Sequence, residues 1–149
     1  MVDTKSVADR IVNRYGTRDP FQVANECGSI IIDVPLQGIR GYHQYVHRCH
    51  IIYLDSTLSE QDRRWVCAHE LGHALMHKGL NRVFMDTQTH MVTSRYEIEA
   101  DRFAADFLFS DDMLQEYNGC SIDTVAHCLG ISNELASYRL QNLCCSPPT

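Results

Sequence analysis

Apolar residues recur along this chain at two periods, which separate predicted helices from predicted strands. Near the start, apolar positions three and four residues apart predict a helix over 4–15 that ends before Gly16. A short second helix is predicted over 20–26, because Asp19 is a good N-cap residue and proline favours the first helical position. Runs rich in β-branched and aromatic residues then predict three strands. These strands cover 30–34, 41–46 and 50–54.

The rest of the chain is predicted to be mainly helical. One long helix begins near Ser59, where Ser59 and Asp62 approximate a capping box, and continues to about residue 78. A polar connection over 79–90 is long enough to form the rim of a cleft. A second long helix is predicted over 94–109. Three short helices follow at 111–117, 121–129 and 133–143.

These elements predict an α+β fold in which a small antiparallel sheet of about three strands packs on the first long helix. We expect residues 1–110 to form this core. Residues 111–149 are expected to form a small helical extension that packs on the core.

The first long helix carries the residues His69-Glu70-Leu71-Gly72-His73, an H-E-x-x-H motif. Residues four apart lie one above the other on a helix, so both imidazoles point the same way and can bind one zinc ion. Glu70 lies next to His69, where its carboxylate can reach a water molecule in the open fourth position of that ion. There it can take a proton from the water and pass it to a leaving amine. The motif therefore predicts a catalytic zinc site with Glu70 as the general base.

The surroundings of Glu70 strengthen this prediction. Glu70 is the only formally charged residue from Trp65 to His77, which predicts a central, buried helix. An unpaired carboxylate in such a place would cost on the order of several kcal/mol. A metal ion and a catalytic role account for it better than two histidines that merely pack in a core.

The second long helix offers a third ligand. Glu97 and Asp101 lie four residues apart on the predicted inward face, whereas Glu99 is expected on the opposite, solvent-exposed face. We therefore predict Glu97 as the ligand. Asp101 is expected to accept a hydrogen bond from the far nitrogen of a zinc-bound histidine and to fix its tautomer. The inward face also includes Ala100, Ala104, Phe107 and Leu108, and the polar face includes Arg102 and Asp106.

Three further residues lie near this site. His77 follows His73 by four residues, but a third histidine ligand of the metzincin type would lie about ten residues after the first and beyond a glycine turn. His77 is therefore expected to be structural or to support a ligand from behind. His90 and Tyr96 lie near the third-ligand helix, where each can either stabilise the oxyanion of a tetrahedral intermediate or simply line the rim.

Composition excludes some classes of protein. The net charge of −6 gives no electrostatic reason to expect nucleic acid as the main partner. No apolar run approaches the ~18 residues needed to cross a bilayer, and the amphipathic start lacks the apolar segment of a signal peptide. The sequence therefore predicts a cytoplasmic protein that has no membrane partner.

The cysteines and a small histidine cluster have simpler interpretations. Seven cysteines without a C-x-x-C pair are typical of free, mostly buried thiols in a reducing compartment. The residues His47-Arg48-Cys49-His50 resemble a ligand set, but neighbouring residues in a strand pair point to opposite faces. A chance cluster is therefore favoured over a second metal site.

Three segments together resemble the ImmA/IrrE family of zinc metallopeptidases. They are T-R-D-P-F-Q-V-A at 17–24, V-C-A-H-E-L-G-H-A-L-M-H at 66–77 and E-x-E-A-D-R-F-A-A-D-F-L at 97–108, and they occur in the family's order. The resemblance implies a compact zincin-like core, the zinc ligands His69, His73 and Glu97, and Glu70 as the catalytic base. It also implies a protein substrate, typically a helix-turn-helix repressor whose cleavage switches on a phage or mobile-element programme.

The last part of the chain offers the alternative. Residues 125–140 have the spacing of a helix-turn-helix, so a non-proteolytic regulatory or DNA-binding protein with a structural zinc site is the rival interpretation. However, residues 111–149 contain five acidic side chains and one basic side chain, Arg139, which is unlike a phosphate-binding surface. A closed structural zinc site also has no use for a buried base. The sequence therefore favours a gluzincin-like zinc endopeptidase.

Overall fold

The computed structural model describes the chain at 1–77 and 90–143, with side chains from residue 94 onward in the second range. The chain divides into two compact units, Met1–Leu108 and Phe109–Thr149. The predicted connection over 79–90 lies almost wholly outside the described residues.

The first two helices have the predicted bounds, since α1 covers Thr4–Tyr15 and α2 covers Pro20–Glu26. Gly16 ends α1 in the left-handed conformation, with φ of 68°, which glycine adopts without the steric cost of a side chain. The side chain of Asp19 caps α2 by accepting a hydrogen bond from the backbone N–H of Phe21. Local sequence signals therefore determine both helices.

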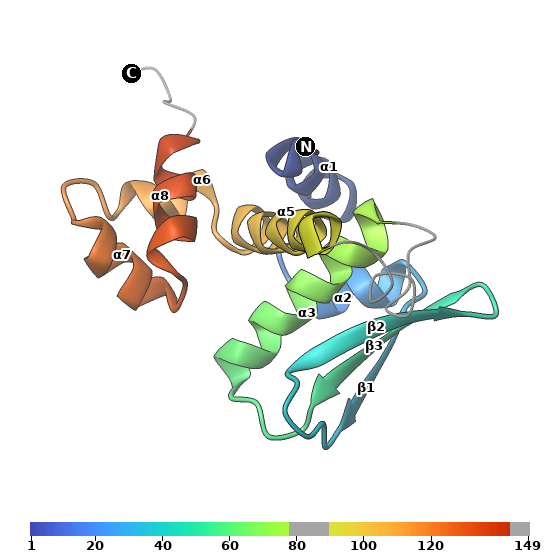
Figure 1. The fold of residues 1–149 in the computed structure, drawn as a ribbon. Helices are drawn as coiled ribbons and strands as arrows, with labels where there is room; N and C mark the ends of the chain where they lie inside the picture. Colours follow the sequence, from blue (N-terminus) through green and yellow to red (C-terminus); the bar gives the residue numbers. More distant parts are fainter. Residues whose placement is uncertain (78–89, 144–149) are drawn as a thin grey trace. The chain divides into compact units, whose positions relative to one another are not determined.

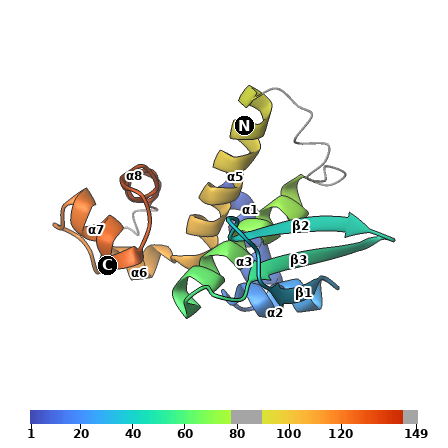
Figure 2. The same ribbon diagram turned by 60° about the horizontal axis from the view of Figure 1, so that its bottom comes forward.

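The three strands are β1 (Ile30–Val34), β2 (Gly41–Val46) and β3 (Cys49–Asp55). The sheet has the order β1-β3-β2, and Figure 2 shows β3 in the middle. β2 pairs antiparallel with β3, whereas β1 pairs parallel with β3. The prediction of a three-stranded sheet is confirmed. The prediction that the sheet is antiparallel is wrong for β1, so the sheet is mixed.

The reason for this difference lies between β1 and β2. No two-residue hairpin turn joins these strands, and the connection of Pro35 to Arg40 leads the chain to the far side of β3. The most buried strand, β3, with Ile52 and Leu54 fully buried, thereby occupies the central position.

Two long helices, α3 (Glu60–Met76) and α5 (His90–Leu108), form the centre of the first unit. Figure 1 shows α3 between the sheet on one side and α5 with α1 on the other, and contacts between these elements agree. The side chain of Ser59 caps α3, as predicted, by accepting from the backbone N–H of Asp62. At Gly41, a Cβ atom would come within 2.6 Å of Val66 Cγ1, so glycine lets β2 lie directly against α3.

One face of α5 differs from the prediction. Glu99 and Asp106 were expected in solvent, but both side chains are buried. The reason for Asp106 is that α1 packs on this face, where the Thr4 hydroxyl donates a hydrogen bond of 2.7 Å to Asp106 Oδ2. Glu99 instead contacts the end of α3 through His77. The face of α5 that was expected in solvent is therefore covered at these two positions, and Glu99 and Asp106 bond inside the unit.

The second unit contains three short helices, α6 (Asp111–Gln115), α7 (Ile122–Leu129) and α8 (Asn133–Gln141). Serine side chains cap all three, and Gly130 ends α7 with φ of 71°. Arg139 is fully buried and donates to the carbonyl of Phe109 and to Asp111. The apolar core of the second unit consists of Leu114, Val125, Ala126, Leu129 and Ala136.

Candidate metal centre

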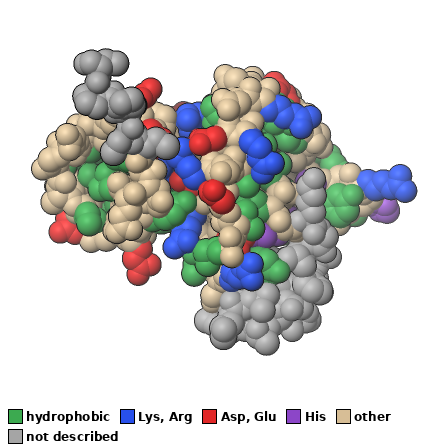
Figure 3. All heavy atoms as spheres, turned by 90° about the horizontal axis from the view of Figure 1, so that it is seen from above, with side chains coloured by type: hydrophobic (Ala, Val, Ile, Leu, Met, Phe, Trp, Pro, Cys, Tyr) green, Lys and Arg blue, Asp and Glu red, His purple; other side chains and the backbone are tan. Residues whose placement is uncertain are grey.

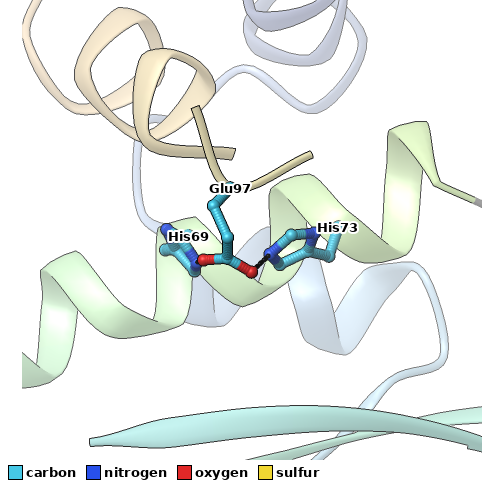
Figure 4. Close-up of side chains that lie close together, drawn as sticks. All are labelled: His69, His73 and Glu97. Carbon is cyan, nitrogen blue, oxygen red and sulfur yellow. Dashed lines mark hydrogen bonds and ion pairs between the residues drawn. The ribbon is translucent and has the colours of Figure 1, made fainter. Parts of the chain in front are cut away.

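The H-E-x-x-H motif lies in the middle of α3, and it brings His69 and His73 to one face of that helix. Glu97, in the first half of α5, places its carboxylate between the two rings, as Figure 4 shows. Its Oε2 lies 3.0 Å from His69 Nε2, and its Oε1 lies 3.1 Å from His73 Nε2. The ligand atoms of all three residues lie within 4.8 Å of one another, in the one such group among the described residues.

His69 has a carboxylate on each side of its ring. Asp101 Oδ1 lies 2.8 Å from His69 Nδ1, the nitrogen that faces away from Glu97. Burial by itself lowers the pKa of His69, but hydrogen bonds to Asp101 and Glu97 outweigh it and raise this pKa to about 10. For Glu97, burial raises the pKa, but hydrogen bonds from His69 and His73 lower it well below its usual range. The site therefore favours positive charge at its centre.

The protons that these contacts require indicate which positive charge fits between His69 and Glu97. Asp101 accepts a hydrogen bond only if His69 Nδ1 carries a proton, because an ionised carboxylate has no donor. A neutral His69 then presents a bare Nε2 to a Glu97 oxygen at 3.0 Å, and two lone pairs at that distance repel. Either a second proton or a metal cation between these atoms removes the repulsion. Two imidazole nitrogens and one carboxylate are a ligand set that zinc accepts in catalytic sites, so these residues fit the ion.

Behind His73 lies a buried line of polar side chains. His73 Nδ1 lies 2.9 Å from His77 Nδ1, and His77 Nε2 lies 3.0 Å from Glu99 Oε2. Arg95 Nε donates to the other Glu99 oxygen at 3.1 Å. His77 therefore lies behind His73, where the sequence predicted a structural or supporting histidine, and its partner Glu99 was not predicted.

Glu70 is buried, as predicted, and its partner comes from the sheet. His43 Nδ1 on β2 lies 3.1 Å from Glu70 Oε2, and both side chains are buried. The ring of His43 also stacks on His73, with centroids 5.3 Å apart and an interplanar angle of 16°. Sequence reasoning did not select His43, since strand alternation shows that it shares a face with Gly41 but not which face meets the motif.

A cleft of about 510 Å³ opens over these groups. The residues that line it come from the segment before and within β2, from α3 and from α5. They are Gly38, Ile39, Arg40, Gly41, Tyr42, His43, Trp65, Val66, His69, Glu70, His73, Glu97 and Asp101. The three predicted ligands, the predicted base Glu70 and Asp101 therefore line one cleft.

Tyr96 and His90 were further candidates near the site. The ring of Tyr96 packs against His77, with centroids 4.5 Å apart, and Tyr96 does not line the cleft. The side chain of His90 lies outside the described residues.

His47 and Arg48 form the turn between β2 and β3. The cysteines in the described part of the chain are free thiols, but the prediction that most are buried is wrong, because only Cys67 is buried and Cys27, Cys120 and Cys128 are exposed. Cys144 and Cys145 lie outside the described residues.

No helix of the described residues is long and apolar enough to span a membrane. On the face drawn in Figure 3, basic and acidic side chains are interspersed and do not gather into one basic patch.

Comparison with known proteins identifies relatives that match most of the chain. Residues 24–141 match the family model of the IrrE N-terminal-like domain, a peptidase family. An immunity region protein 2 of Bacillus phage phi105 is 33% identical over 91% of this chain and 87% of its own length. Metallopeptidase ImmA of Bacillus subtilis is 23% identical over 93% of this chain and 85% of its own length.

A solved structure supports the fold. A Mycobacterium tuberculosis transcriptional regulator superimposes with a TM-score of 0.62 at 17% identity. The match covers 99% of this chain and 49% of the regulator, so this chain spans about half the length of that protein. Together, the family match and the relatives show that the chain belongs to the IrrE N-terminal-like family, which is of the metallopeptidase type.

Proposed function

We propose that this protein is a zinc-dependent endopeptidase in which His69, His73 and Glu97 hold the zinc ion. One observation carries the proposal: the three ligand atoms lie within 4.8 Å of one another, in the same cleft as the carboxylate of Glu70. When bound, a zinc ion lowers the pKa of a water molecule and polarises a peptide carbonyl.

Glu70 is proposed as the general base. It follows His69 directly in α3, so its carboxylate reaches the same part of the cleft as the ligands. It accepts the proton of the attacking water and then gives that proton to the nitrogen of the leaving amine. His43 holds one oxygen of Glu70 at 3.1 Å, which leaves the other oxygen to exchange the proton. His43 is thus proposed as the residue that orients the base.

The cleft favours an extended peptide. β2 is an edge strand, and the segment from Gly38 to His43 lines the cleft beside the ligands. An extended substrate can therefore add to the free edge of β2 through backbone hydrogen bonds. Ile39, Tyr42 and Trp65 give the wall an apolar character, and we expect apolar substrate side chains near the cleaved bond.

We further propose that the substrate is a helix-turn-helix repressor in the cytoplasm, whose cleavage activates a phage or mobile-element programme. One relative bears the name of an immunity region protein and another that of the metallopeptidase ImmA, which supports a substrate of this class.

The alternative is a non-proteolytic, DNA-binding protein with a structural zinc site. The helices α7 and α8, joined through Gly130, favour it because they have the order and spacing of a helix-turn-helix. Against it, Arg139 is the one basic residue of 111–149 and is fully buried against Asp111. No exposed lysine or arginine therefore remains in the described part of this unit to contact phosphates.

The decisive experiment is Glu70→Gln. The amide keeps the shape of the side chain but cannot accept the proton of water, so cleavage should fall by at least ~100-fold while zinc content stays stoichiometric. The variant should also retain intact repressor in a pull-down. Zinc content, capture and cleavage are measured side by side.

Two controls frame this experiment. Glu60→Gln changes an exposed glutamate of the same helix and should leave all three measurements unchanged. Glu97→Gln should lose zinc and cleavage together. If Glu70→Gln cleaves the repressor at nearly the parental rate, the peptidase mechanism is wrong and a binding-only antagonist becomes the better explanation.

A further inference from the structure

A buried line of side chains runs from His73 away from the cleft. His73, His77 and Glu99 have exposed fractions of 3%, 4% and 1%, and neither His77 nor Glu99 lines the cleft. Successive polar atoms along the line lie 2.9 Å and 3.0 Å apart. The line thus connects the C-terminal end of α3 with α5 on the side of His73 opposite Glu97.

With both rings neutral and Glu99 ionised, only one arrangement of protons satisfies the two contacts that join His73, His77 and Glu99. Glu99 is paired with Arg95 at 3.1 Å, and an ionised carboxylate can only accept hydrogen bonds. His77 must therefore carry its proton on Nε2 and donate it to Glu99, which leaves His77 Nδ1 bare. Because His77 Nδ1 is bare, the nitrogen that faces it, His73 Nδ1, must be the donor. A neutral His73 then has its free lone pair on Nε2, the atom that faces Glu97.

The two histidines of the motif are supported differently. His69 is held by Asp101, whose side chain is 42% exposed, so water competes for that hydrogen bond. His73 is held through His77 by a carboxylate that is 1% exposed, so no water competes with it. Hydrogen bonds in such surroundings constrain a ring more strongly, and their loss leaves a buried donor without an acceptor.

We propose that His77 and Glu99 are positioning residues that keep His73 in the tautomer and ring orientation that a metal ligand needs. Arg95 stabilises the carboxylate at the end of the line from a partly exposed position. This inference rests on the proposed role of His73 as a zinc ligand. It adds that binding at His73 depends on two residues that touch neither the metal ion nor the substrate.

The first test uses the protein without metal. Long-range ¹H–¹⁵N spectra of the imidazole rings distinguish a proton on Nδ1 from one on Nε2. We expect His73 with its proton on Nδ1 and His77 with its proton on Nε2. In Glu99→Gln, the amide can donate as well as accept, so both rings should become tautomer mixtures. A His73 ring in the parental protein that carries its proton on Nε2 and none on Nδ1 would overturn the inference.

The second test measures zinc affinity by competition with a coloured chelator. His77→Phe keeps a ring but removes the acceptor, and we expect affinity to fall by about 10–100-fold. Glu99→Gln should lower it about tenfold, and Arg95→Met by less than about threefold, since Arg95 is 55% exposed and acts only through Glu99. Glu116→Gln, an exposed change in the second unit, is the matched control and should have no effect. Asp101→Asn should weaken affinity without changing the His73 tautomer.

The outcomes separate the two proposals. If the parental protein binds no zinc, the proposed metal site is wrong, whatever the spectra show. The inference is wrong if the parental protein binds zinc and folded His77→Phe and Glu99→Gln both keep a zinc affinity within about threefold of it. His77 and Glu99 would then be merely structural. If His77→Phe does not fold, Glu99→Gln decides, because it preserves the size of the buried side chain.

Discussion

Gly72 of α3 lies directly against the ring of Phe103 on α5: a Cβ atom at Gly72 would come within 2.9 Å of Cδ1 and 3.2 Å of Cγ. Phe103 is fully buried and cannot move aside without disturbing the packing between the two helices. The glycine of the motif therefore permits the close approach of α3 and α5. That approach brings Glu97 within reach of His69 and His73.

Gly72→Ala is expected to destabilise the protein by about 1–3 kcal/mol, because overpacking outweighs the helix propensity that alanine adds. Urea denaturation measures the free energy of unfolding. Phe103→Leu should also be destabilising, but the double variant should be less destabilised than the sum of the two, since leucine leaves room for the new methyl group. Strict additivity would show that the two residues do not limit the approach of the helices.

The sequence predicted most of this site because the relevant signals are local. Residues four apart on a helix share a face whatever surrounds it, so His69 with His73 and Glu97 with Asp101 follow from spacing alone. His43 and Glu99 were missed because their positions beside the site depend on tertiary contacts. Helix periodicity placed Glu99 opposite Glu97, but it could not show that the end of α3 would cover that position. The parallel pairing of β1 was missed for the same reason, since strand order is not encoded in the strands themselves.

The hydrogen bond from Thr4 to Asp106 should stabilise the contact of α1 with α5. Thr4→Val removes a buried donor while keeping the side-chain shape, so we expect a loss of about 1–3 kcal/mol in the free energy of unfolding. Thr57→Val is the matched control, because the exposed Thr57 hydroxyl donates to Asp55 in the same way at 2.6 Å. Water can replace that bond, so the control should cost less than about 1 kcal/mol. Chemical denaturation measures the free energy of unfolding of both variants. Equal losses would contradict the expectation that the buried hydrogen bond contributes more than the exposed one.

Zinc should raise the melting temperature of the parental protein, since an ion that binds only the folded state stabilises it. At a free zinc concentration of about 100 times the Kd, the gain is roughly 2.7 kcal/mol. His69→Ala and Glu97→Gln should abolish this gain, because three ligands leave none to spare. Differential scanning calorimetry with and without a chelator measures it, and Glu134→Gln, an exposed change in α8, is the control. A full zinc-dependent shift in Glu97→Gln would exclude Glu97 as a ligand.

His43→Phe tests whether the sheet orients the base. Phenylalanine can keep the stacking on His73 but cannot bond to Glu70, whose carboxylate is then free to turn within the cleft. A misplacement of about 1 Å costs on the order of 100-fold in rate, so we expect kcat for repressor cleavage to fall by about that factor. Zinc content and KM should change little, because His43 is not among the three clustered ligand residues. Tyr45→Phe, an exposed change in the same strand, should leave kcat unaffected. If His43→Phe instead loses zinc while kcat per bound zinc stays at the parental value, His43 acts on the metal site through His73 and not on Glu70.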